Sequence, residues 1–359
     1  MGSIKKVKWG VLGAANIALK KVIPGMQAGE WCEIAAIASR NFTKAHEAAK
    51  KLQIQKAYGS YEELLKDPEI EAVYIPLPNH LHVPWSIKAA RAGKHVLCEK
   101  PVSLNVAGAK KLLAERDRAK VKIGEAFMVK THPQWLRTRE LVRSGTIGEL
   151  KTIEGHFSYF NRDAANVRNV AKWGGGGMFD IGCYPIVTSR FIFEEEPKRV
   201  VGIIERDPEF KVDRLTSAIL DFPSGQATFT CSTQMVPYQR MQFFGTKGRI
   251  EVEIPFNAPP DKATRIFVDD GKDVFGGGIT VESFAVCDQY TIQGDAFSRA
   301  IRGDGEVPMT LEDSIANMAV IDAVFRSAKK GSWQEPRGVV KAKKTGAKGK
   351  SSSAKQKRS

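Results

Sequence analysis

The strongest constraint on the fold is an alternation of two hydrophobic periods over the first 130 residues. The short apolar runs, rich in β-branched residues, span residues 7–12, 33–38, 72–76, 95–98 and 123–128. The amphipathic stretches between and after them lie near residues 15–28, 43–53, 61–67, 81–93 and 104–119. This alternation predicts βαβ units, and hence a doubly wound parallel sheet with helices on both faces. Ligands of such a sheet bind beyond the carboxyl ends of its strands.

The pattern changes after about residue 130, which predicts a second domain. A helix is expected at 133–144 and another near 311–329. Between them, longer alternating runs span residues 151–160, 199–206, 216–222, 226–234, 239–244 and 249–252. They predict an α+β domain with one large, open, mostly antiparallel sheet. We therefore expect a dinucleotide-binding Rossmann domain at 1–130, a substrate and oligomerisation domain at 131–338, and a basic disordered tail at 339–359.

The net charge of +15 is unevenly distributed along the 359 residues. Residues 341–359 carry eight Lys and Arg and no acid, which leaves +7 on the rest of the chain. This milder excess is compatible with a ligand that carries phosphate. The composition of the tail is typical of a solvated extension. A nonspecific contact with nucleic acid or an acidic surface is the alternative, and specific nucleic-acid binding is not expected.

The cysteines and the apolar runs indicate the compartment. Five cysteines, with no C-x-x-C pair, make a poor disulfide framework and favour free thiols in a reducing, cytoplasmic environment. The sequence contains no run of 18 apolar residues, so no membrane span is predicted. The uncharged run 9–19 resembles a short signal peptide, but it continues into the α/β pattern and is interpreted as a strand and turn. His80 and His82 lack the i,i+4 spacing of a zinc helix, so no metal site is predicted.

A glycine-containing turn follows the first expected strand. Residues 10–18 read GVLGAANIA, and the fingerprint G-x-G-x-x-G is matched at positions 13, 15 and 18 by Gly, Ala and Ala. Amides of such a turn can face a pyrophosphate at a helix start. We expect cofactor contacts from Gly13, Ala15, Asn16 and Ile17, although the motif alone also fits a merely structural turn.

The end of the second expected strand indicates which nicotinamide cofactor binds. Ser39 and Arg40 occupy the place where NAD-specific folds usually carry an acid, and Lys44 lies one turn further. A guanidinium there can pair with a 2′-phosphate. We therefore expect NADP in preference to NAD, with contacts from Ser39, Arg40 and Lys44. A solvated arginine at a helix start is the alternative.

Two further strand ends carry polar residues. Pro78, Asn79 and His82 follow the third strand, where they would face the nicotinamide ribose, while Asn79 could equally cap the next helix. Glu99 and Lys100 end the strand in GKHVLCEKP (93–101). A lysine at this edge can bind a substrate oxygen or assist proton transfer. We expect all five of these residues to contact the cofactor, and Lys100 also the substrate.

The segment GGGGMFDIGCYP spans residues 174–185. Its four glycines can let the loop fold against a ligand, or they can leave the loop flexible. Asp180 and Tyr184 are four residues apart and share a face if this segment is helical. Because Pro185 is tolerated only near a helix start or a kink, this geometry is conditional.

Together, the GxxGAANIA turn, the GKHVLCEKP strand end and the GGGGxxDIGCY segment resemble the glucose–fructose oxidoreductase / inositol dehydrogenase (Gfo/Idh/MocA) family. The resemblance runs from about residue 6 to 335. Residues 125–134 (EAFMVKTHPQ) and 166–168 (NVR) resemble the branch of NADP-dependent xylose and dihydrodiol dehydrogenases. The resemblance implies a Rossmann domain, an open-faced sheet domain that pairs in homo-oligomers, and a cis proline at Pro101.

The resemblance also implies roles for individual residues. Lys100 matches the catalytic lysine of the family and Asp180 a substrate-binding acid; Tyr184 stands where inositol dehydrogenases carry His, which makes myo-inositol a poor first guess. His132 and Arg168, from the branch motifs, are expected to bind substrate together with Lys100, Asp180 and Tyr184.

We therefore expect an NADP(H)-dependent oxidoreductase that acts on a sugar or cyclic polyol, with aldose C1 oxidation as the first choice. Lys100, Tyr184 and Asp180 form the expected catalytic group, in which the Lys100 ammonium favours the tyrosinate of Tyr184. The alternatives are a non-catalytic NADP-binding sensor or co-repressor on the same fold, and a reductase of a ketosugar or dicarbonyl.

Overall fold

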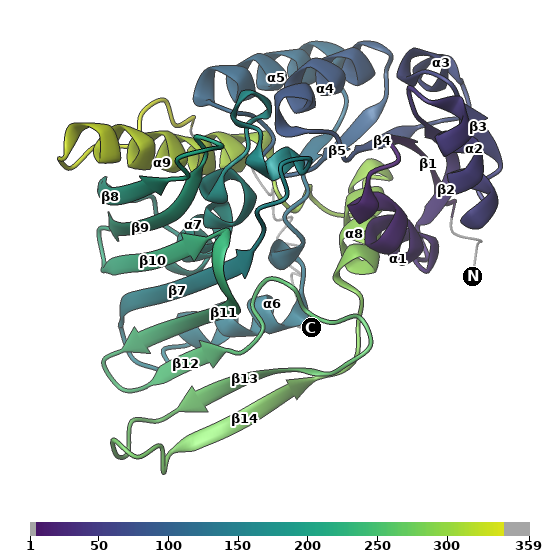
Figure 1. Cartoon of the computed structure of the whole chain (residues 1–359). Coiled ribbons are helices and arrows are strands. Elements are labelled where there is room, and N and C mark those ends of the chain that lie inside the picture. The colour runs from purple at the N-terminus through teal and green to yellow at the C-terminus, as the bar shows by residue number, and fades with distance from the viewer. Residues whose placement is uncertain (1–4, 341–359) are drawn as a thin grey trace, which may run out of the picture.

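The computed structural model describes residues 5–340; of the predicted tail at 339–359, residues 341–359 lie outside this range. Its first half is a six-stranded, all-parallel sheet in the order β3-β2-β1-β4-β5-β6 (Figure 1). The strands are β1 (Val7–Leu12), β2 (Cys32–Ala38), β3 (Lys56–Tyr58), β4 (Ala72–Ile75), β5 (His95–Cys98) and β6 (Ile123–Glu125). The expected parallel sheet is confirmed, and only the three-residue edge strand β3 was not predicted. The strand order reverses between β1 and β4, where α/β sheets open a ligand crevice.

Helices cover both faces of this sheet (Figure 1). They are η1 (Ala18–Val22), α1 (Ile23–Gln27), α2 (Phe42–Lys51), α3 (Tyr61–Lys66), α4 (His82–Arg91) and α5 (Val106–Ala119). The side chains of Asn41, Ser60 and Asn105 accept an amide hydrogen bond at the starts of α2, α3 and α5. Local sequence thus fixes where these three helices begin.

One helix reaches this sheet from the far end of the chain. Helix α8 (Gln289–Ile301) packs on α1, and Trp9 Nε1 donates to Ser298 Oγ over 3.0 Å. Arg302, just after α8, pairs with Glu71 over 2.7 Å. The predicted division assigns residues 289–301 to the second domain, but these contacts place them on the first sheet.

The second half is an eight-stranded sheet in the order β14-β13-β12-β11-β7-β10-β9-β8. The strands are β7 (Leu150–Phe160), β8 (Arg199–Arg206), β9 (Asp213–Asp221), β10 (Gln226–Ser232), β11 (Gln234–Gly245), β12 (Arg249–Val252), β13 (Thr264–Asp269) and β14 (Ile279–Phe284). Every neighbouring pair is antiparallel except β7 and β10. The mostly antiparallel sheet is confirmed, with β13 and β14 as a hairpin that the sequence did not predict.

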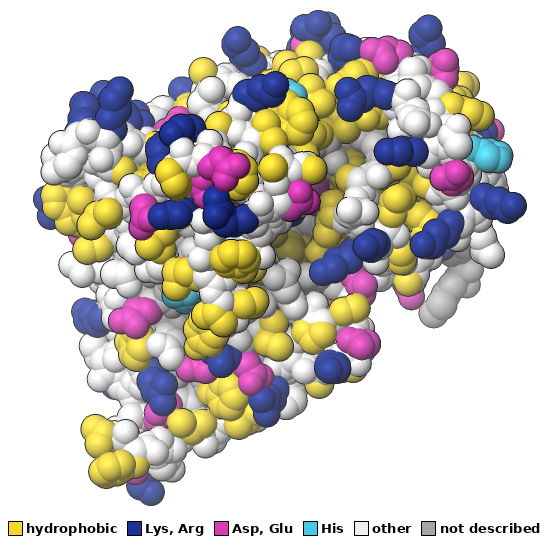
Figure 2. Space-filling view, viewed as in Figure 1, with side chains coloured by type: hydrophobic (Ala, Val, Ile, Leu, Met, Phe, Trp, Pro, Cys, Tyr) yellow, Lys and Arg dark blue, Asp and Glu magenta, His cyan; other side chains and the backbone are white. Residues whose placement is uncertain are grey.

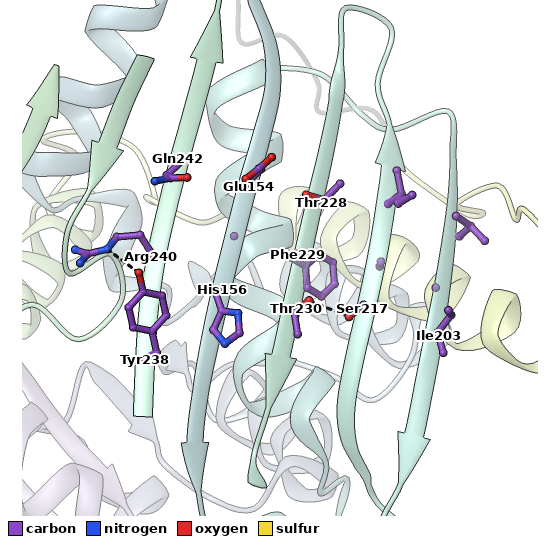
Figure 3. Close-up of a pocket in the computed structure, with 15 residues that line it drawn as sticks. Glu154, His156, Ile203, Ser217, Thr228, Phe229, Thr230, Tyr238, Arg240 and Gln242 are labelled. Carbon is purple, nitrogen blue, oxygen red and sulfur yellow. Dashed lines mark hydrogen bonds between the residues drawn. The ribbon is translucent and has the colours of Figure 1, made fainter. Parts of the chain in front are cut away.

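The two faces of this sheet differ in their cover. Helices α6 (Pro133–Arg143), α7 (Cys183–Phe193) and α9 (Leu311–Lys330) lie on one face (Figure 1). Along β7, Ile153 and Phe157 are buried under these helices, whereas Glu154 and His156 line a hollow on the other face (Figure 3). This alternation is the period-2 pattern of a strand.

The charged side chains are not separated by sign on the face shown in Figure 2, where basic and acidic side chains are interspersed. Among the described helices, none combines the length and apolar character needed to cross a bilayer. No cluster of three or more potential metal-ligating side chains occurs within residues 5–340.

Candidate active site

The turn after β1 is built to approach a ligand closely. Gly13 has a φ of +127°, which L side chains rarely adopt, and its amide donates to the Ala38 carbonyl oxygen over 2.9 Å. A Cβ at Gly13 would lie 3.1 Å from a Leu77 methyl group. Asn16 is exposed, and Ala15 and Ile17 are partly buried where the helical segment begins. The turn therefore fits the pyrophosphate of a dinucleotide, as the sequence predicts.

The end of β2 presents a basic, hydroxyl-bearing loop. Arg40 and Lys44 are exposed, and Arg40 lies against the hydroxyl of Tyr61. Ser39 Oγ accepts a hydrogen bond from the Asn41 amide over 3.2 Å, which leaves its own proton free to donate. These groups fit a 2′-phosphate, and no acid occupies this strand end.

The loop after β4 departs from the expected contacts. Asn79 neither caps α4 nor is left free, because its Nδ2 donates to the Gly174 carbonyl oxygen over 2.8 Å. His82 is fully buried, and its ring nitrogens lie 2.7 and 2.6 Å from the carbonyl oxygens of Pro101 and Leu77. The expected cofactor contact of His82 is therefore corrected, since both ring nitrogens face backbone carbonyl oxygens in the interior. Pro78 precedes the short 3₁₀ turn η2 (Asn79–Leu81).

Glu99 and Lys100 leave β5 in different directions. Glu99 accepts a hydrogen bond from Tyr74 Oη over 2.6 Å, and burial raises the pKa of its carboxyl group. The Lys100 ammonium instead donates to the Asp180 carbonyl oxygen over 2.5 Å and lies 3.4 Å from Asp180 Oδ1. The bond from Lys100 to Pro101 is cis, which confirms that expectation. The two side chains thus do not form a surface ion pair.

Asp180 is the centre of a polar cluster. Its Oδ2 accepts a hydrogen bond from Tyr159 Oη over 2.5 Å and pairs with Arg168 Nε over 2.8 Å. Burial alone would raise the pKa of Asp180, but Arg168, Lys100 and Tyr159 together hold it below its usual range. The carboxylate therefore stays ionised, and it orients a lysine and an arginine toward one point.

Tyr184 lies directly below Lys100. The Lys100 ammonium is 4.9 Å from the centre of the Tyr184 ring, which packs edge-on against Phe127 and Phe157. Tyr184 is only 4% exposed, and its hydroxyl lies 3.5 Å from Met128 Sδ. Burial raises the pKa of the phenol well above its ordinary value. The predicted tyrosinate is therefore disfavoured by burial in this structure.

Comparisons with known proteins cover most of the chain. The family model for the oxidoreductase family with an NAD-binding Rossmann fold (GFO_IDH_MocA) matches residues 7–127, and the GFO/IDH/MocA C-terminal domain matches residues 135–251. A D-xylose 1-dehydrogenase (NADP(+)) from Haloferax volcanii is 38% identical over 91% of this chain and 99% of its own length.

The chain belongs to the Gfo/Idh/MocA oxidoreductase family. An uncharacterized oxidoreductase of Rhizobium meliloti is 47% identical over 91% of this chain and 98% of its own length. A solved 3-ketoreductase from Actinomadura kijaniata, in complex with NADP and TDP-benzene, is 27% identical, covers 90% of this chain and 98% of its own, and has a TM-score of 0.83. The suspected family and the fold are thereby confirmed, and the family is one of oxidoreductases with an NAD-binding Rossmann fold.

The glycine-rich segment 174–177 of this family member packs closely against its neighbours. A Cβ at Gly174 would lie 2.3 Å from a Leu104 methyl group. Gly176 has a φ of +119°, and a Cβ there would lie 2.0 Å from Asp213 Oδ1. The helical segment that follows starts as a π-helix at Met178–Gly182 and continues as α7, so Asp180 and Tyr184 both reach Lys100.

The His132 side chain is buried at the start of α6. It is 1% exposed, and its Nδ1 accepts a hydrogen bond from the Gln134 amide over 3.3 Å at the start of α6. Its Nε2 lies 3.5 Å from Cys287 Sγ. The expected substrate contact of His132 is therefore corrected to a helix cap.

Tyr159 is a site residue that the sequence analysis missed. It lies on β7, on the same strand face as Phe157, and its hydroxyl reaches Asp180 from a distance of 21 residues along the chain. The available signal was the period-2 pattern of residues 150–160, which places 157 and 159 on one face. That pattern does not show that α7 covers this face.

Proposed function

We propose that this chain is an NADP(H)-dependent oxidoreductase that oxidises a hydroxyl-bearing carbon of a sugar or cyclic polyol, with C1 of an aldose as the first choice. One observation carries the proposal. Lys100, at the carboxyl edge of the parallel sheet, meets Asp180 and Tyr184 from the other half of the molecule. The nicotinamide ring would supply the hydride acceptor at this edge.

The residues at this junction have complementary tasks. The Lys100 ammonium would bind the reacting oxygen and stabilise negative charge that develops on it. Asp180 stays ionised and would accept hydrogen bonds from neighbouring hydroxyl groups of the substrate, with Arg168 as a second polar contact. Tyr184 would exchange the hydroxyl proton once substrate brings its phenol and Lys100 together.

The preference for NADP follows from the end of β2. Arg40 is exposed there and Ser39 has a proton to donate, so both can reach a 2′-phosphate. The name of the Haloferax relative and the NADP in the Actinomadura structure support this choice.

The test is a substrate panel with the purified full-length chain. NADP reduction at 340 nm is followed with aldoses, polyols and trans-dihydrodiols, each also with NAD. Turnover of at least one aldose with NADP is expected. If the protein binds NADPH but turns over none of these compounds in either direction, the alternative of a non-catalytic sensor is favoured.

A specific observation favours a second candidate, the reduction of a ketosugar. Burial raises the pKa of the Tyr184 phenol, which favours the protonated form that a proton donor to a carbonyl oxygen requires. Relatives named dTDP-3,4-didehydro-2,6-dideoxy-alpha-D-glucose 3-reductase include one from Streptomyces violaceoruber, 31% identical over 85% of this chain and 88% of its own length. NADPH oxidation with ketosugars and their nucleotide-linked forms distinguishes this candidate from aldose oxidation.

We propose, in addition, a homo-oligomer in which the uncovered faces of two eight-stranded sheets meet. This face exposes Ile203, on β8, to 78%, and Tyr238, on β11, to 48%. Polar side chains of β7, β9 and β10 lie between them (Figure 3). Apolar groups flanked by polar ones are typical of such contacts.

A further inference from the structure

Asp213 is not one of the residues assigned to the candidate site, yet it is buried directly beside that site. It is the first residue of β9 and is 2% exposed. Its Oδ2 accepts a hydrogen bond from the Met178 amide over 2.6 Å, and the carboxylate also faces the Gly177 amide. Met178 is two residues before Asp180, so this contact holds the first turn of the segment that carries Asp180 and Tyr184.

The glycine-rich segment is shaped around this carboxylate. Any side chain at Gly176 would collide with Asp213 Oδ1, at 2.0 Å from an ideal Cβ. The Gly176 amide donates to the Arg168 carbonyl oxygen over 2.9 Å. Residues 174–177 therefore wrap Asp213 and connect it to Arg168 on one side and to Asp180 on the other.

The contact between Asp213 and the start of the helical segment has a physical cause. Burial raises the pKa of the Asp213 carboxyl group to about 7, although the amides of Met178 and Gly177 and the positive end of the helix dipole favour its ionised form. Because the acceptor here is on β9, the helix start is tied to the eight-stranded sheet. A shift of Asp213 would move Asp180, and with it the two atoms that hold the Lys100 ammonium.

We propose that Asp213 is a positioning residue for the reaction proposed above. It touches no substrate, and it acts by fixing residues 176–184 so that Asp180 and Tyr184 meet Lys100. The inference rests on the proposed function for its kinetic part, whereas the anchoring itself is measurable without turnover.

The test compares Asp213→Asn with a matched control, Asp207→Asn. The first substitution keeps the size of the side chain but replaces one of the two acceptor oxygens with an amide nitrogen, which can only donate and cannot accept from a backbone amide. Asp207 is a fully buried carboxylate in the turn that joins β8 to β9. Its hydrogen bonds go to the amides of Glu209 and Phe210 and to Gln234 Nε2, and Arg162 lies 3.6 Å away.

We expect Asp213→Asn to lower kcat about 10- to 100-fold, since small misplacements of reacting groups have effects of this size. The Kd for NADPH should stay within about twofold, because the dinucleotide turn is on the other sheet. Hydrogen–deuterium exchange should accelerate in peptides from residues 176–184. Asp207→Asn should change neither kcat nor exchange in those peptides, although its melting temperature falls.

Three results would overturn the proposal. The first is an Asp213→Asn variant with wild-type kcat and wild-type exchange at 176–184. The second is a parallel loss of kcat and melting temperature in both variants, which indicates general destabilisation. If Asp213→Asn does not fold, Gly176→Ala displaces the same carboxylate, and a normal kcat in that variant is the third. If the wild type turns over no substrate, the proposed function fails, and the exchange at 176–184 alone decides the anchoring.

Discussion

The two sheets contribute to the candidate site in different ways, one through an edge and the other through a face. The parallel sheet contributes only its carboxyl edge, where Gly13, Arg40, Asn79 and Lys100 each follow a strand. The eight-stranded sheet contributes a face: Tyr159 projects from β7, and the helical segment on that face carries Asp180 and Tyr184. An edge gathers residues from successive loops, whereas a face needs a second layer to complete it.

This difference separates the tasks of the two halves. The edge offers amides and basic groups that suit a phosphate-bearing cofactor, and its one reactive group is Lys100. The face offers a carboxylate and phenols that suit a polyhydroxylated substrate. The following changes test whether the tasks divide in this way.

The largest effect is expected from Lys100→Ala, which removes the one group that both halves share. We expect kcat to fall about 10²- to 10⁴-fold, as for loss of a general acid–base or oxyanion-stabilising group. Steady-state kinetics on the best sugar measure this, with Lys130→Ala as a control lysine. A kcat within a fewfold of wild type would show that the edge contributes binding alone.

Tyr184→Phe is expected to have the next largest effect. The ring can still pack against Phe127 and Phe157, so folding and NADPH binding should persist. Loss of the hydroxyl should lower kcat about 10²-fold. Because Lys100 and Tyr184 act as one unit, the double variant should lose little more than Lys100→Ala. Additive losses in the double variant would mean that they act separately.

Arg40→Ala tests the edge alone. A charge-assisted contact with a 2′-phosphate contributes about 1.5–3 kcal/mol, so the preference for NADP over NAD should fall roughly 10- to 100-fold. The kcat at saturating cofactor should change little. Cofactor titrations with wild type and variant give the ratio, and an unchanged preference would move the specificity away from the end of β2.

Asp313→Asn tests the junction of the two halves. Asp313, on α9, pairs with Arg190 over 2.7 Å and with Lys130 over 2.9 Å. Burial alone would raise the pKa of Asp313, but these cations lower it to about 2. Since this value is below the ordinary 3.8, the contribution to stability is present above about pH 4 and is lost as the pH falls toward 2.

The variant should therefore lose about 2 kcal/mol of unfolding free energy at pH 7. The difference from wild type should shrink as the pH falls below 4. Denaturant titrations at several pH values measure both. A pH-independent difference would assign the loss to packing.

The smallest effect on turnover is expected from Ile203→Asp, on the uncovered face. A charge there should weaken the proposed contact between copies and shift the mass seen by light scattering toward the monomer. The kcat per chain should stay within about twofold, because the site lies on the other face. Unchanged mass at low concentration would show that this face is not the contact.

The sequence predicted residues on the edge and on the face by different routes. Strand ends are local features, so Gly13, Ser39, Arg40, Glu99 and Lys100 were predicted from runs of apolar residues followed by polar ones, whereas roles for Asp180 and Tyr184 came from the resemblance to the family. Errors arose where a side chain turned inward. His82 and His132 were predicted to contact ligands, but the ring nitrogens of His82 face two backbone carbonyl oxygens, and those of His132 face the Gln134 amide and Cys287 Sγ.

The sequence by itself determined the alternation of strands and helices, the glycine turn and the motifs of the family, since these depend on neighbours within a few residues. Only the tertiary structure decided that α8 returns to the first sheet, that Tyr159 reaches Asp180, and that burial raises the pKa of the Tyr184 phenol. Those outcomes depend on which segments exclude water from one another, and a linear pattern records the burial of a residue but not the identity of what covers it.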